Sequence, residues 1–130
     1  KRSLIKFFLK GKITKKQHKI FLKKYSYLER LDFILVKKNT QKMVGAINLK
    51  KKKSYFEIGK FISDQKYISK GIMQKAFFNF LKYVRNYFKI KEIYSETKIT
   101  NYRNIIFNLK NNFKIQETKK NLVIMKLKLN

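Results

Sequence analysis

Residues 55–80 read YFEIGKFISDQKYISKGIMQKAFFNF and join a predicted strand to a predicted helix. Branched and aromatic side chains over 55–62 are typical of a strand, and apolar residues recur at helical spacing from Gly71 to Phe88. The first turn of a helix presents unpaired N–H groups and the positive end of the helix dipole, and a glycine there lets other groups approach the backbone. The junction therefore predicts a phosphate-binding turn, with a simple strand-to-helix connection as the alternative.

The rest of the chain contains the same two kinds of element. Thr14 and Gln17 form a capping-box pattern that predicts a helix start, and further strands are predicted at 31–36, 43–49, 92–97 and 122–129. A last helix is predicted from Asn101 to Leu109, and Asn111–Asn112 follows it as a left-handed exit, because Asn tolerates positive φ. These elements predict an α/β (α+β) domain with a mostly antiparallel central sheet of about six strands, flanked by helices.

Length and composition limit the classes of protein that the chain can belong to. At 130 residues it is long enough for a single domain, 1–130, and the absence of Cys excludes disulfides and cysteine nucleophiles. With one His and seven Asp or Glu residues we expect no metal site. No run of eighteen apolar residues and no recognisable leader occur, so we expect no membrane span and a cytoplasmic location.

The net charge of +27 comes mainly from lysine, because only four of the 34 basic residues are Arg. A surface that binds nucleic acid would favour clustered Arg, whose planar fork binds phosphate through two hydrogen bonds. The four Arg are scattered along the chain. We therefore expect the charge to attract anionic ligands in general, and nucleic acid is not the expected partner.

Four segments, in order along the chain, resemble the GNAT family of acetyl-CoA-dependent N-acetyltransferases: MVGAINL (43–49), FEIGKFI (56–62), YISKGIMQKAFF (67–78) and IYSETKITNYRNIIFNLKNNF (93–113). The resemblance covers 43–113, more than half of the chain, and implies a GNAT-like sheet with acetyl-CoA as cosubstrate. The family's first strand would be missing, so we expect the domain to be incomplete at its N-terminus.

In this family a loop of pattern Arg/Gln-x-x-Gly-x-Gly/Ala holds the coenzyme A pyrophosphate with backbone amides. Only the central glycine is kept here, and the resemblance implies contacts from Ile68, Ser69, Lys70, Gly71, Ile72 and Met73. It also implies that backbone N–H groups around Ile62 and Ser63 hold the oxyanion, and that Asn101 lines the acetyl-pantetheine arm. Asn108 falls where many members place a Tyr as the acid for the thiolate, so the thiolate either leaves unassisted or takes a proton from a neighbouring Tyr.

Two carboxylates are candidates for the base that removes a proton from the acceptor amine through water. Glu57 and Glu96 lie on strands that border the cleft in the family. We prefer Glu57, whose FEIG segment resembles the family more closely. The alternative for each is a half-exposed carboxylate paired with one of the many lysines.

The single histidine, His18, lies in the segment ITKKQHKIF at 13–21. This segment resembles the Ile-Ser-x-x-x-His-x-x-Phe stretch of the bacterial nucleotide-amino-sugar N-acetyltransferases of pseudaminic acid synthesis, where it borders the acceptor pocket. The resemblance implies that His18 contacts a small-molecule amine acceptor, the 4-amino group of a nucleotide-linked sugar; a surface or packing role is the alternative for His18. Alternative functions are acetylation of a ribosomal-protein or peptide N-terminus and a non-catalytic basic RNA-binding module.

Overall fold

The computed structural model describes residues 30–63, 65–88 and 90–129. The elements in chain order are β1 (Arg30–Val36), β2 (Met43–Lys51), β3 (Phe56–Ile62), the short 3-10 helix η1 (Gln65–Tyr67), α3 (Ile72–Tyr87), β4 (Glu92–Lys98), α4 (Tyr102–Lys110), β5 (Lys114–Lys119) and β6 (Leu122–Lys128). The predicted α/β class is confirmed. The helix predicted at Thr14 and the expectation of a missing first strand fall outside the described residues.

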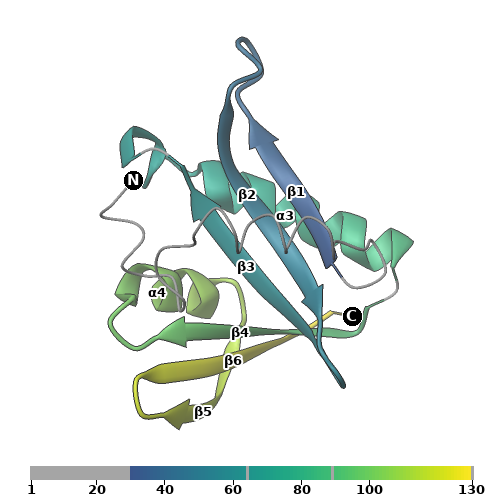
Figure 1. The fold of residues 1–130 in the computed structure, drawn as a ribbon, viewed down its shortest axis with the longest axis vertical. Helices are drawn as coiled ribbons and strands as arrows, with labels where there is room; N and C mark the ends of the chain where they lie inside the picture. Colours follow the sequence, from purple (N-terminus) through teal and green to yellow (C-terminus); the bar gives the residue numbers. More distant parts are fainter. Residues whose placement is uncertain (1–29, 64, 89, 130) are drawn as a thin grey trace, which may run out of the picture.

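The six strands form one sheet in the order β1-β2-β3-β4-β6-β5 (Figure 1). Four of the neighbouring pairs are antiparallel, and only β3 and β4 run parallel. The mostly antiparallel sheet predicted from the sequence is therefore present, with its parallel pair at the centre.

The central parallel pair is short. β3 and β4 pair only through Phe56 with Ile93 and Glu57 with Tyr94, whereas each strand pairs along its whole length with its other neighbour. Beyond these two pairs the strands diverge toward their C-terminal ends, and Figure 1 shows α4 beside the opening. We call this opening the split.

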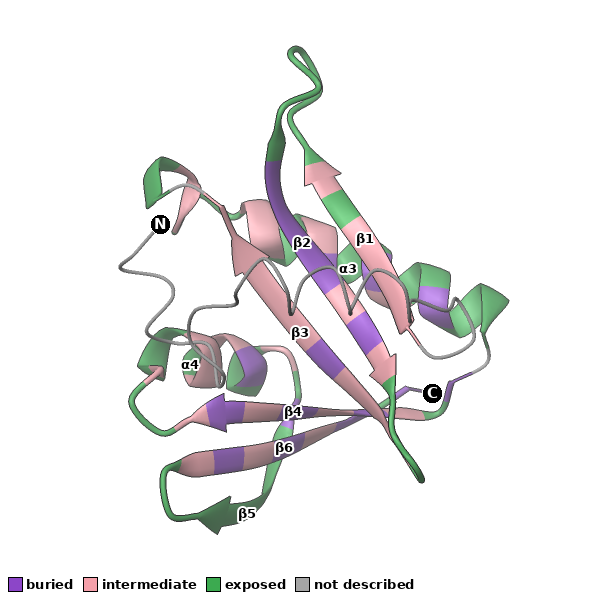
Figure 2. Ribbon diagram, in the orientation of Figure 1, coloured by how far each residue is buried: buried purple, intermediate pink, exposed green. Residues whose placement is uncertain are grey.

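The core lies between the sheet and the two helices. α3 buries the predicted apolar stripe through Phe77, Phe80 and Val84, which join a cluster that includes Leu49 and Met125 of the sheet. Figure 2 shows buried segments of the ribbon on α3 and on the inner strands. The Phe77 ring also lies 5.4 Å from the ring of Phe107 on α4. Both helices therefore pack on the same face of the sheet, the helix face.

The element boundaries agree with the prediction to within two residues, except for one strand that was not predicted. β5 reads KIQETK, and all six of its residues are exposed. Because neither face of this strand is buried, its sequence shows no alternation of apolar and polar residues. It forms because its backbone pairs with β6. Asn112 has φ 71°, which confirms the predicted left-handed exit from α4.

Candidate active site

Beyond the last pair with β4, the inner edge of β3 faces the split. The Ser63 N–H donates to the Val44 carbonyl at 2.8 Å. Because amides alternate in direction along a strand, the N–H groups of Lys60 and Ile62 then point away from β2 and toward the split. Of the two residues expected to hold the oxyanion, Ile62 therefore presents its amide to the split, while the Ser63 amide is used within the sheet.

The loop between β3 and α3 ends in an uncapped helix start. Ser69 and Gly71 have positive φ angles of 63° and 76°, and Gly71 is the N-cap of α3 without any side-chain hydrogen bond to the first turn. A Cβ built on Gly71 would meet no atom of the described chain within 4 Å. No described residue therefore fills the space beside the N-cap of α3, as an anion site requires.

At this helix start the main-chain N–H groups, rather than the side chains of the loop, are the groups available to an anion. Ser69 and Lys70 are exposed, and Ile68 and Ile72 are half-buried. Met73 packs against the hydrophobic core. The residues predicted to hold the pyrophosphate thus surround one helix start, where main-chain N–H groups rather than side chains would bind it.

The two candidate bases lie on the sheet face opposite the helices. Glu57 belongs to the last β3–β4 pair and so stands at the closed end of the split. Its side chain is 15% exposed, and Oε2 lies 3.8 Å from Lys52 Nζ. Glu96 shares this face because Ser95 and Thr97 point into the core, and it lies farther along β4. Glu57 thus lies closer to the closed end of the split than Glu96 does.

Asn101 and Asn108 occupy opposite ends of α4. Asn101 is the N-cap, and its Oδ1 accepts from the Asn104 N–H at 3.3 Å. Asn108 is fully buried, and its Nδ2 donates to Ser95 Oγ at 3.1 Å. The Asn101 side chain therefore stabilises the helix start in this structure, while Asn108 belongs to a buried polar chain that continues through Ser95 to Thr97, 3.1 Å away.

Lys60 is a residue of the site that the sequence analysis did not single out. Its ammonium group donates to Asn108 Oδ1 at 2.7 Å and lies 4.9 Å from the centre of the Phe107 ring. Burial lowers the pKa of Lys60 from 10.5 to about 7. The only sequence signal was a lysine at an inward position of β3, between the apolar residues Ile58 and Ile62.

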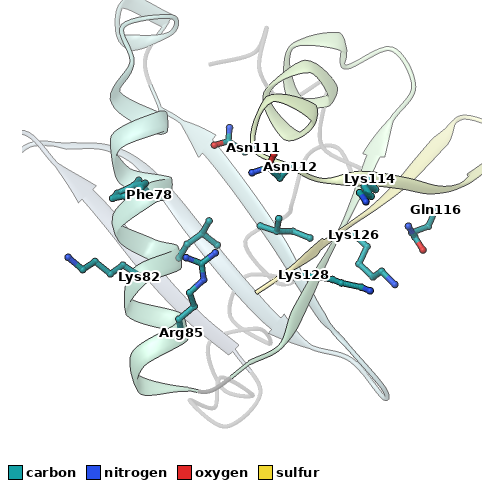
Figure 3. Close-up of a pocket in the computed structure, with 11 residues that line it drawn as sticks. Phe78, Lys82, Arg85, Asn111, Asn112, Lys114, Gln116, Lys126 and Lys128 are labelled. Atoms are coloured by element: carbon teal, nitrogen blue, oxygen red, sulfur yellow. The ribbon is translucent and has the colours of Figure 1, made fainter. Parts of the chain in front are cut away.

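A separate groove of about 850 Å³ lies between α3 and the start of β5 (Figure 3). Its cationic lining residues are Lys82, Arg85, Lys114, Lys126 and Lys128. Within the described parts of the chain, no cluster of three or more metal-binding side chains is found. Nor does the described region contain a helix long and apolar enough to cross a membrane.

The chain belongs to the GNAT acetyltransferase family, because the family model for the acetyltransferase (GNAT) domain matches residues 3–114. Among solved structures, a domain from Methanocaldococcus jannaschii DSM 2661 has 24% identity and a TM-score of 0.85, over 99% of this chain and 86% of that one. A GNAT-family acetyltransferase from Bacillus anthracis has 19% identity and a TM-score of 0.79, over 98% and 82% of the two chains.

The Campylobacter jejuni N-acetyltransferase PseH, in complex with acetyl coenzyme A, has 17% identity and a TM-score of 0.70, over 88% of this chain and 79% of that one. A search of curated proteins gave no match. The family model thus identifies the chain as an N-acetyltransferase of the GNAT type, and the structural likenesses agree with the fold.

Proposed function

We propose that this N-acetyltransferase moves the acetyl group of acetyl-CoA to the amino group of a nucleotide-linked sugar. The observation that carries the proposal is the split, which begins beside Glu57 and has the inner edge of β3 along one side. It offers backbone N–H groups to an extended ligand that enters between the strands, in the way that a strand edge binds a peptide.

Acetyl-CoA would bind with its pyrophosphate at the first turn of α3 and its pantetheine arm along β3. The open space at Gly71 and the uncapped helix start support the first part. The amides of Lys60 and Ile62, directed to the split, support the second, because the arm itself carries amide groups that pair with them. The thioester would then lie near the Ile62 N–H, which holds the oxyanion.

The reaction needs a neutral amine that can reach the carbonyl carbon of the thioester from above or below the plane of the carbonyl group. Glu57 would take the surplus proton of the attacking nitrogen through a chain of water molecules, because it stands at the closed end of the split, on the face away from the helices and about 16 Å along β3 from Ile62. Glu96, on the same face, is the second candidate for this role.

The acceptor is inferred from charge. A protein with net charge +27 repels a polycation and favours an acceptor that carries a diphosphate. Structurally similar proteins include PseH, a spermidine N-acetyltransferase from Vibrio cholerae and a ribosomal-protein-S5-alanine acetyltransferase from Vibrio fischeri. The names of the last two give polyamine and ribosomal-protein acceptors, which the charge disfavours. His18, proposed to touch the acceptor, lies outside the described residues.

A thiol-release assay with acetyl-CoA and a panel of amines tests the acceptor. We expect the highest kcat/KM with nucleotide-linked amino sugars, and a value at least about fivefold lower with spermidine and N-terminal peptides, because one unfavourable ion pair costs about 1 kcal/mol or more. His18→Ala should raise the acceptor KM. Turnover of peptides without turnover of sugars would refute the assignment, and an unaltered KM would remove His18 from the pocket.

RNA binding is the second candidate, and the cationic groove between α3 and β5 is the observation that favours it. Filter binding over a salt series separates the two functions, because true phosphate contacts give a steep loss of affinity with salt. The acetyltransferase proposal would give way to RNA binding if RNA bound tightly, if Arg85→Gln abolished that binding, and if the protein had no affinity for coenzyme A.

A further inference from the structure

Lys60 spans the split on the helix face. It belongs to β3, the last strand of one half of the sheet, and its ammonium reaches Asn108, which is anchored to β4 of the other half through Ser95. Lys60 lies three residues beyond Glu57, where β3 and β4 have already separated. A ligand that passes between the two strands therefore runs alongside this ammonium group.

Among the residues that the structure describes, no group forms an ion pair with Lys60. The groups against it are Asn108 and Phe107 from α4 and the cross-strand residue Ile47 from β2, and none of these titrates. Its charge is held by one amide oxygen and one aromatic ring.

Lys60 also lies next to Asn108, the position at which many family members place the acid that protonates the thiolate. It donates to Asn108, the α4 residue that has no acidic proton to give. The described tyrosines of α4 and β4 do not occupy this position. Tyr102 on α4 is 69% exposed, and Tyr94 points to the sheet face opposite the helices, where it contacts Tyr55.

We propose that Lys60 is the catalytic acid that protonates the coenzyme A thiolate. The inference rests on the proposed function. The acceptor nitrogen attacks the carbonyl carbon of the thioester and forms the C–N bond, and the C–S bond then breaks with its electron pair left on sulfur. The Lys60 ammonium gives one proton to that sulfur, and the surplus proton on nitrogen leaves through water to Glu57. Lys60 regains its proton from solvent after the products depart.

The acidity of Lys60 suits this step. Burial lowers the pKa of Lys60 to about 7, whereas an ordinary thiol has a pKa of about 8.5. Proton transfer from the ammonium to the thiolate is therefore favourable by about 1.5 pKa units. The acid acts in its charged form, which predominates below pH 7, so kcat should fall as the pH rises through the pKa of Lys60.

The first test is a titration that needs no acceptor. Bound coenzyme A is titrated by the ultraviolet absorbance of its thiolate in the wild type and in Lys60→Gln, which keeps a donor for Asn108 but carries no charge. We expect the bound thiol to ionise in two steps in the wild type, the first together with the loss of the Lys60 proton near pH 7, and in a single step in the Gln variant, because two groups in contact titrate as a pair. Identical single-step titrations of the thiol in both proteins would overturn the role of Lys60 and leave the acetyltransferase function intact, whereas failure to bind coenzyme A would overturn both.

The second test is the pH profile of thiol release. We expect Lys60→Gln to lower kcat by about 100-fold and remove its descending limb, with the Kd for acetyl-CoA within about threefold. Lys60→Arg keeps the charge but cannot release a proton, so it should not restore kcat. Restoration by Arg, or an unchanged profile in the Gln variant, would show that Lys60 only holds β3 to α4.

Discussion

Replacing Gly71 with Asp is expected to reduce the affinity for coenzyme A by about 100-fold or more, without loss of folding. The new carboxylate would stand at the first turn of α3, where the pyrophosphate is proposed to bind, and like charges placed together cost several kcal/mol. The fold should survive the change, because a Cβ at Gly71 meets no described atom within 4 Å and the φ of 76° costs a residue other than Gly about 1–2 kcal/mol, least for Asn and Asp. Calorimetric titration with coenzyme A measures the loss.

The matched control for this variant is Gly71→Asn. Asn has nearly the same size as Asp, carries no charge and tolerates the positive φ of 76° at this position. We expect its Kd to stay within about fivefold of the wild-type value, because only strain and side-chain bulk are added. Equal affinities of the Asp and Asn variants would show that no phosphate binds at this helix start.

Glu57→Gln is expected to lower kcat/KM for acetyl transfer by about 100-fold, because a positioned general base contributes at least that much. The amide keeps the shape of the carboxylate. The lost contact with Lys52, at 3.8 Å, contributes little to stability because the lysine side chain is 42% exposed and the pair is screened by solvent. Thiol release at saturating acetyl-CoA measures the effect, and the Kd for acetyl-CoA should not change.

Glu96→Gln is the control, since Glu96 lies on the same sheet face but farther from the closed end of the split. Its kcat/KM should stay within about threefold of the wild-type value, as for a surface carboxylate without a catalytic role. A larger loss in the Glu96 variant than in the Glu57 variant would exchange their roles, and two unaffected variants would remove both from the mechanism.

The elements that could be predicted from the sequence are those with their own local signal. The stripe of α3 and the branched residues of β3 are periodic, and Asn112 carries the residue type that its positive φ favours. β5 lacks such a signal because its six residues are exposed, and it depends on pairing with β6. Sequence periodicity therefore predicts packed elements well and an exposed edge strand poorly.

The geometry of the site depends on contacts between distant parts of the chain. Lys60 and Asn108 are 48 residues apart, and nothing local to either residue indicates that they meet. The β3–β4 pairing is likewise limited to two residue pairs, and nothing in the sequence of either strand indicates where it ends. The resemblance implied where the cofactor would enter, but the buried lysine beside its path required the structure.

Hydrogen exchange of the backbone amides, with and without coenzyme A, tests the central claim that the cofactor occupies the split. We expect coenzyme A to slow exchange at the amides of Lys60 and Ile62 on β3 and at Ile72, Met73 and Gln74 in the first turn of α3. The amides of β5, on the far edge of the sheet, serve as the internal control and should not change. Protection confined to the cationic groove between α3 and β5, with no change along β3 and the start of α3, would contradict this account.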